Sequence, residues 1–145
     1  MLASVGLFLF IAGFVIGLGA VTVIDLLGFL GRTGGYWTEA TIRAHKVTKP
    51  LIWLGTALAV VGGGITYYGE PLAGMVLTHL VLACVLIANG AYLSFVVSPI
   101  LLAREREGRA TECLPASLQR RIVVSMLISD VGWWSALVLL VLYLV

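Results

Sequence analysis

Long runs of apolar residues dominate this chain, and short stretches between them carry nearly all of its charge. The runs occupy positions of about 2–31, 50–69, 71–103 and 121–145. They are continuous rather than alternating, which favours helices over barrel strands, because a helix satisfies its backbone N–H and C=O groups within its own segment in hydrocarbon. Each run meets the requirement of about 20 apolar residues for crossing a bilayer. The pattern predicts an all-α integral membrane protein, a single domain over residues 1–145 with four transmembrane helices in a bundle.

Composition supports a membrane protein, and the distribution of charge predicts the orientation of the bundle in the membrane. Of 145 residues, 61% are hydrophobic and 11% are charged, whereas soluble domains carry about 25% charged residues. All nine Lys and Arg residues fall within 32–49 or 104–121, the first and third connections between the runs. Because Lys and Arg are concentrated in cytoplasmic loops, we expect the cell (inner) membrane, both basic loops in the cytoplasm and both termini outside. The middle connection, 67–71, then forms a tight external turn.

The basic loops are expected to meet the anionic headgroups of the inner leaflet. The residues assigned to this role are Arg43, Lys46, Lys49, Arg120 and Arg121. The same loops also carry four glutamates, which disfavours nucleic acid as a partner.

Local signals in the loops predict additional helix. Thr38 is a candidate N-cap for a short amphipathic helix at the inner interface that leads into the second transmembrane helix. A bend at Pro50 would hold His45 and Lys49, four residues apart, on one face. The run from 104 to 109 reads as a continuation of the third helix that ends near Gly108.

Small residues mark the faces on which helices approach closely in lipid. In the first run Gly6, Gly13, Gly17, Ala20, Gly28 and Gly31 share one face; the second run has Gly55 and Gly62 to Gly64, and the fourth has Ser125, Ser129, Gly132 and Ala136. We interpret these positions as helix packing rather than as ligand sites.

Polar residues inside the apolar runs are the candidates for function, because they are costly in a bilayer. Asp130 is nine residues past Arg121, roughly 13 Å along a helix at 1.5 Å per residue, and so lies near mid-membrane, either protonated or paired. Asp25 is predicted nearer the inner interface. Counting residues along each run from the membrane face places both carboxylates and His45 in the cytoplasmic half of the membrane, and Asn89 near its middle.

Two interpretations of this group stay open. The carboxylates and imidazole could share a proton or hold a cation through oxygen and nitrogen ligands, although the sequence identifies no particular metal. Alternatively, Asp25 pairs with Lys49, Arg120 or Arg121 and only stabilises the bundle.

His79 is a secondary candidate in the outer half of the third helix, and its simpler interpretation is a hydrogen-bonded bundle histidine. A haem bridging His45 and His79 is disfavoured, because depth counting separates the two imidazoles by something like 20 Å in a hydrocarbon core of about 30 Å. No cofactor is predicted. Trp133 and Trp134, also near mid-membrane, are predicted to fill a subunit interface, with packing against a flat cofactor as the alternative.

Soluble-type enzyme chemistry finds no motif here. The chain has no Gly-rich phosphate loop, nucleophile elbow or zinc-type His spacing, and Cys84 and Cys113 are predicted at different membrane depths. Two hypotheses remain. The first is a proton- or cation-coupled transporter or channel, with its path at an oligomer interface because four helices enclose little volume. The second is a non-catalytic membrane subunit or assembly protein that binds another membrane protein or anionic lipid.

Overall fold

The computed structural model describes residues 2–31 and 36–145, and within them every regular element is helical. The elements are α1 (Leu2–Gly31), α2 (Tyr36–Thr66), α3 (Gly74–Tyr92), the π-helical turn η1 (Leu93–Val97), α4 (Ser98–Arg106) and α5 (Ala116–Leu144). Because α3, η1 and α4 follow one another without a break, they form one long rod. In this part of the chain four helices are long and apolar enough to cross a membrane, as the sequence predicted.

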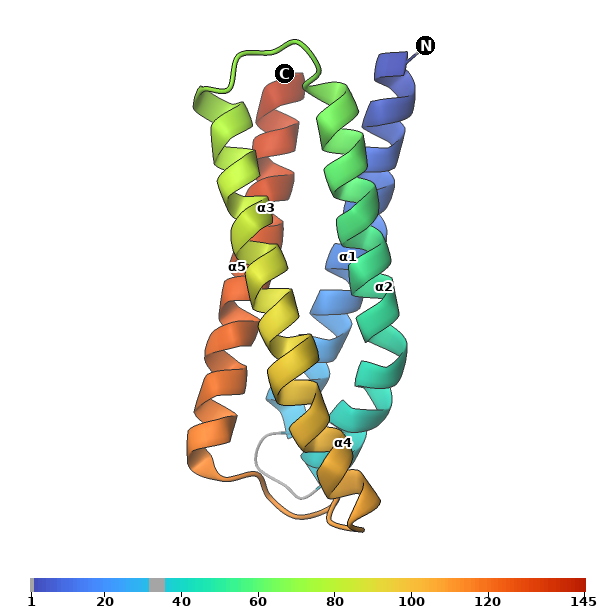
Figure 1. The fold of residues 1–145 in the computed structure, drawn as a ribbon, viewed down its shortest axis with the longest axis vertical. Coiled ribbons are helices and arrows are strands. Elements are labelled where there is room, and N and C mark those ends of the chain that lie inside the picture. Colours follow the sequence, from blue (N-terminus) through green and yellow to red (C-terminus); the bar gives the residue numbers. More distant parts are fainter. Residues whose placement is uncertain (1, 32–35) are drawn as a thin grey trace.

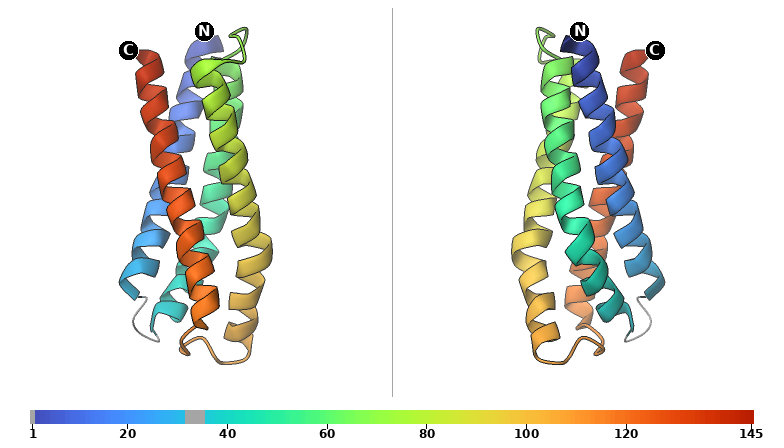
Figure 2. Two further views of the ribbon diagram at one scale, coloured as in Figure 1. Left: turned by 90° about the vertical axis from the view of Figure 1, so that its left-hand side faces the viewer. Right: turned by 90° about the vertical axis from the view of Figure 1, so that its right-hand side faces the viewer.

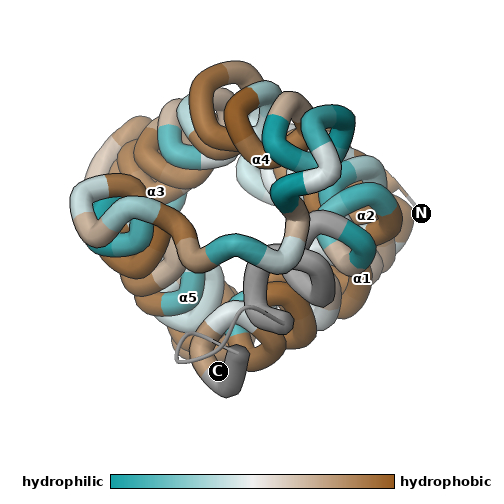
Figure 3. The backbone as a smooth tube through the Cα atoms, turned by 90° about the horizontal axis from the view of Figure 1, so that it is seen from below, coloured by the Kyte–Doolittle hydropathy of each residue, from teal (hydrophilic) through white to brown (hydrophobic). Residues whose placement is uncertain are grey.

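The four rods run up and down in an antiparallel bundle (Figure 1). The start of α1, the end of α5 and the α2–α3 connection lie at one end of the bundle, here called the terminal end, and the α4–α5 connection lies at the opposite, basic end (Figures 1 and 2). Seen along the axis, the rods occupy the corners of a square in the order α1, α2, α3–α4, α5 (Figure 3). Contact between α1 and α2 is by far the most extensive, and contact between α2 and α3 is slight.

Glycines explain why α1 and α2 approach so closely. A Cβ atom at Gly13 would lie 2.7 Å from the carbonyl oxygen of Gly55, and one at Gly62 would lie 2.7 Å from the Cα of Phe10. Since real Cβ atoms do not come this near to backbone, these positions tolerate only glycine at the observed helix spacing. The predicted role of the small residues in close packing is confirmed for this pair of helices.

The start of α2 differs from the sequence prediction. The helix begins at Tyr36, two residues before Thr38, so Thr38 is not its N-cap. It then continues through Pro50 to Thr66, and the residues before Pro50 belong to α2 itself rather than to a separate short helix. A proline inside a helix removes one backbone hydrogen bond, and α2 continues past Pro50 because its other backbone hydrogen bonds remain. Whether this part of α2 lies at the membrane interface stays a prediction.

Positive φ angles at glycine end or begin elements in the two connections that the structure describes. Gly69 (φ 87°) and Gly74 (φ 53°) shape the turn between α2 and α3, and Gly108 (φ 72°) follows the end of α4. Glycine adopts these angles without the steric cost that a Cβ atom imposes. The predicted end of the third rod near Gly108 is therefore confirmed.

Candidate functional site

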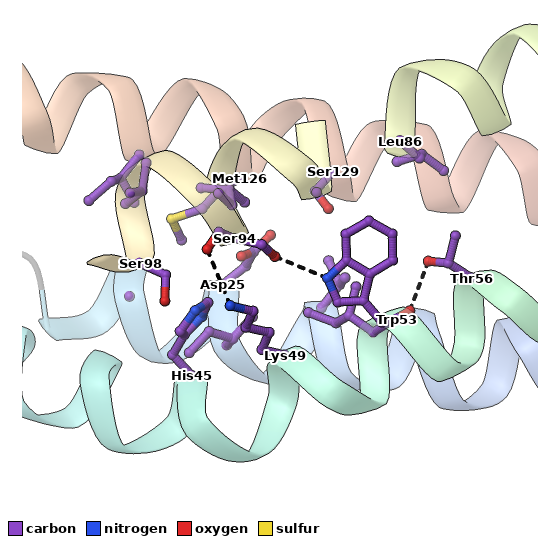
Figure 4. Close-up of a pocket in the computed structure, with 18 of the residues that line it drawn as sticks. Asp25, His45, Lys49, Trp53, Thr56, Leu86, Ser94, Ser98, Met126 and Ser129 are labelled. Carbon is purple, nitrogen blue, oxygen red and sulfur yellow. Dashed lines mark hydrogen bonds between the residues drawn. The ribbon is translucent and has the colours of Figure 1, made fainter. Parts of the chain in front are cut away.

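A cavity of about 80 Å³ lies inside the half of the bundle nearer the basic end, and we call it the basic-end cavity. Each long rod contributes to its wall (Figure 4). Its polar lining residues are Asp25 from α1, His45, Lys49, Trp53 and Thr56 from α2, Ser94 and Ser98 from the third rod, and Ser129 from α5. A buried water needs roughly 10–15 Å³ of such space and two to four polar partners, so the cavity is large and polar enough for several waters.

The π-turn in the third rod gives this cavity an unsatisfied carbonyl group. The Ser98 N–H donates to the carbonyl of Leu93, five residues earlier, and so does not reach Ser94. The next amide that could reach Ser94 in a π-turn belongs to Pro99, which has no N–H. The Ser94 carbonyl is therefore left without a backbone donor, because of the π-turn and the proline together.

Two side chains of α2 satisfy Ser94 instead (Figure 4). Lys49 Nζ donates to the Ser94 carbonyl at 3.2 Å, and Trp53 Nε1 donates to Ser94 Oγ at 3.0 Å. Lys49 also lies 5.9 Å from the centre of the Phe95 ring. These bonds join α2 to the third rod at a point where the two helices otherwise touch little, and they hold an ammonium group inside the bundle.

Asp25 and Asp130 come close enough to each other to interact electrostatically. Oδ2 of Asp25 and Oδ1 of Asp130 are both buried and have no hydrogen-bond partner. Within the described residues, no ion pair joins Asp25 to Lys49, Arg120 or Arg121. The structure thus brings the two predicted carboxylates together and shows none of the ion pairs that the structural interpretation of Asp25 requires.

His45 and Lys49 lie on the cavity side of α2, as their spacing indicated, and Lys49 is near enough to act on the imidazole electrostatically. Nε2 of His45 is buried without a hydrogen-bond partner. Lys49 was assigned to lipid headgroups, but its ammonium group lies in the cavity. By contrast, Lys46 pairs with Glu105 at 2.8 Å outside it.

The other basic residues assigned to headgroups lie on the surface: Arg43, Arg120 and Arg121 are exposed.

Asn89 is not part of this cluster. Its Nδ2 donates to the Ser125 carbonyl at 2.9 Å, and its Oδ1 accepts from the Ser125 hydroxyl. The amide and the hydroxyl satisfy each other, and the residue joins α3 to α5 instead of facing either cavity.

A second cavity, of about 390 Å³, lies toward the terminal end, and we call it the terminal-end cavity. His79, which lines it, is buried and has both ring nitrogens paired: Nε2 with the Ala136 carbonyl at 2.8 Å and Nδ1 with the Tyr67 hydroxyl at 2.9 Å. A carbonyl can only accept, so in the neutral imidazole Nε2 carries the proton and Nδ1 accepts from Tyr67. His45 and His79 line different cavities.

Trp133 corrects one prediction. Its side chain is 3% exposed and packs within its own bundle, edge-on to Phe14 at 5.8 Å between ring centres. A Cβ atom at Gly17 would lie 2.9 Å from Cζ2 of Trp133, so the missing side chain of this glycine makes room for the indole. Trp133 therefore fills no subunit interface. Trp134, next to it on α5, is 51% exposed.

Sequence reasoning missed Ser94, Ser98 and the inward position of Trp53. A signal was present, since two serines four residues apart precede Pro99 in an otherwise apolar run. That pattern indicates a disturbed helix with polar groups on one face, but it does not say which neighbour they meet.

Comparison with protein-family models, curated proteins and solved structures gave no match. Among the described residues, no group of three or more His, Cys, Asp and Glu side chains is placed to hold a metal ion.

Proposed function

We propose that this protein is a proton- or cation-coupled membrane transporter or channel in which Asp25 and Asp130 carry the ion. The observation that supports this most is the pair of buried carboxylate atoms without partners, on helices that meet only in the folded bundle. Ionised carboxylates in a bilayer are costly and mark ion or proton pathways. Two of them close together repel, and a proton or cation held by the pair relieves that repulsion.

The surroundings of the pair suit exchange rather than permanent pairing. Asp25 faces a cavity that also contains an imidazole with a partnerless Nε2 and an ammonium group. An imidazole can accept a proton at one ring nitrogen and release one from the other, which makes His45 a candidate relay toward the basic end. Lys49, which donates to the Ser94 carbonyl, adds a positive charge to the wall of the same cavity.

A route along the bundle axis is suggested by the two cavities. Thr56, Leu86 and Trp133 line both of them, so these side chains stand between the two spaces. Movement of one aromatic and one aliphatic side chain would join a polar cavity at the basic end to the larger one at the terminal end. We propose that the cytoplasm lies at the basic end, in the inner membrane of the cell, with both termini outside.

The test is ion flux in liposomes that contain the purified protein. A potassium diffusion potential drives protons, read with an internal pH dye, and parallel gradients test Na⁺ and K⁺. We expect flux with the unchanged protein and its loss with Asp25→Asn and with Asp130→Asn, which keep the shape and remove the charge. Glu105→Gln, on the surface beside Lys46, removes a carboxylate outside both cavities and serves as the matched control.

Absence of flux for all three ions, or full flux in both Asn variants, would refute this proposal. The alternative is a subunit that binds another membrane protein. This alternative is favoured by the exposure of the third rod. Of the most apolar 18-residue stretch within Gly74–Arg106, only 11% is buried inside the protein, whereas 39% of the corresponding stretch within Leu2–Phe29 is buried.

A further inference from the structure

The terminal-end cavity has the dimensions and wall of a ligand site. Its volume of about 390 Å³ falls within the range of roughly 300–1,000 Å³ that is typical of small-molecule pockets. Residues of α2 and α3 form most of its wall, and these are the neighbouring helices with the slightest contact. In a bilayer such a cavity lies beside the hydrocarbon, so an apolar molecule could enter from the lipid.

The hydroxyl and imidazole donors that line this cavity are already used within the protein. The Tyr67 hydroxyl donates to His79 Nδ1, and His79 Nε2–H donates to the Ala136 carbonyl. The Thr56 hydroxyl donates to the Ile52 carbonyl at 2.8 Å. Trp133 contributes aromatic surface and one indole N–H. What Tyr67 still offers is its oxygen as an acceptor, and burial together with the nearby Tyr143 raises the pKa of Tyr67 to about 12, so the hydroxyl keeps its proton.

Charge at this site has one sign. Glu70 lines the cavity at the terminal end and is the only Asp, Glu, Lys or Arg between positions 50 and 103. Its carboxylate forms no ion pair with any residue that the structure describes. The apolar walls, the negative charge of Glu70 and the acceptor oxygen of Tyr67 favour a ligand with an apolar body and a positively charged group that donates hydrogen bonds.

We infer that the terminal-end cavity binds lipid-soluble amines in their ammonium form. The apolar body lies among Phe10, Phe14 and Trp133, and the ammonium group donates to Tyr67 Oη and Glu70. The aromatic faces add cation–π attraction for the charge. A carboxylate of the same shape is disfavoured, because Glu70 carries a like charge and the Tyr67, His79 and Thr56 donors are already used. This site goes beyond the proposed ion transport and does not require Asp25 or Asp130.

The experiment uses three probes that share one apolar body: 1-aminoadamantane, 1-adamantanol and adamantane-1-carboxylate. Each is equilibrated by dialysis with the full chain in zwitterionic lipid nanodiscs, and binding to empty nanodiscs is subtracted. We expect saturable binding of the amine, weaker binding of the alcohol and none of the carboxylate. Because no ion flux is measured, this test and the transport test can fail independently.

Variants locate the site. Glu70→Gln removes one partly screened charge, so we expect the affinity for the amine to fall about two- to fivefold, with no change for the alcohol. Gly64→Leu fills the cavity and is expected to abolish binding of both. Gly19→Leu is its matched control, because a Cβ atom at either glycine meets nothing within 4 Å and only Gly64 lines the cavity.

Equal binding of all three probes, or binding no greater than to empty nanodiscs, overturns the inference. Amine binding that Gly64→Leu leaves unchanged, or that Gly19→Leu abolishes equally, also overturns it, because the site would then lie elsewhere. Circular dichroism and gel filtration confirm that each variant is folded before its binding is interpreted.

Discussion

Replacing Gly62 by alanine is expected to destabilise the protein, although alanine is normally the better helix former. The added Cβ atom would lie 2.7 Å from the Cα of Phe10 and 2.8 Å from the carbonyl oxygen of Gly6, both backbone atoms of α1. No side-chain rotation relieves such a contact, so α1 and α2 must move apart. Gly64, two residues later in the same helix, has nothing within 4 Å of the same added atom and provides the control.

The magnitude follows from two opposing effects. Overpacking of a close interface costs about 1–3 kcal/mol, and replacing glycine by alanine in a helix returns up to about 1 kcal/mol. We therefore expect Gly62→Ala to lower the free energy of unfolding by about 1–2 kcal/mol. Gly64→Ala should leave it unchanged or raise it by up to about 1 kcal/mol.

Unfolding is measured by circular dichroism during titration of the detergent-solubilised protein with sodium dodecyl sulphate. Both variants are titrated beside the unchanged protein at one protein and detergent concentration. Equal stability of Gly62→Ala and Gly64→Ala would refute the argument, because the close approach of α1 and α2 would then make no energetic difference. A larger loss for Gly64→Ala would place the helix contact on a different face of α2.

Two further predictions concern the third rod and the orientation of the bundle. Lys49→Met leaves the Ser94 carbonyl without a donor and should lower the free energy of unfolding by about 1–3 kcal/mol. Pro99→Ala restores a backbone N–H and should reduce that loss, which a double-mutant cycle measures as a coupling energy. A coupling energy near zero would contradict the account of the π-turn. Cys113 is exposed in the connection after α4 and should resist a membrane-impermeant thiol reagent in intact cells, because that end of the bundle is proposed to face the cytoplasm. A cysteine introduced at Gly69 should react. The reverse labelling pattern would show that the basic end is outside.

The number of helices, their rough limits and many of their ends follow from the sequence. Long continuous apolar runs predict that the surrounding solvent is lipid. In hydrocarbon, the backbone N–H and C=O groups of each helix must form their hydrogen bonds within that helix. Gly108 ends the third rod, and α5 begins directly after Pro115, because these residues act on their immediate neighbours. The glycine face of α1 was also readable, since it depends only on the helical repeat.

Only the tertiary structure decided which polar groups meet. Asn89 was a candidate for ion or proton binding near the middle of the membrane, yet its rotational position on α3 turns it to Ser125. Lys49, read as a surface charge, turns inward because the Ser94 carbonyl has no other donor.

The physical reason is that depth in a membrane depends on position along one helix, whereas contact depends on how several helices are rotated about their axes. A π-turn adds to this uncertainty: one extra residue per turn rotates all that follows by about 100° relative to a regular helix. The sequence therefore determined which residues are costly in lipid and roughly how deep they lie. The packing of α1 on α2 and the π-turn before Pro99 decided that Asp25, His45 and Lys49 share one cavity.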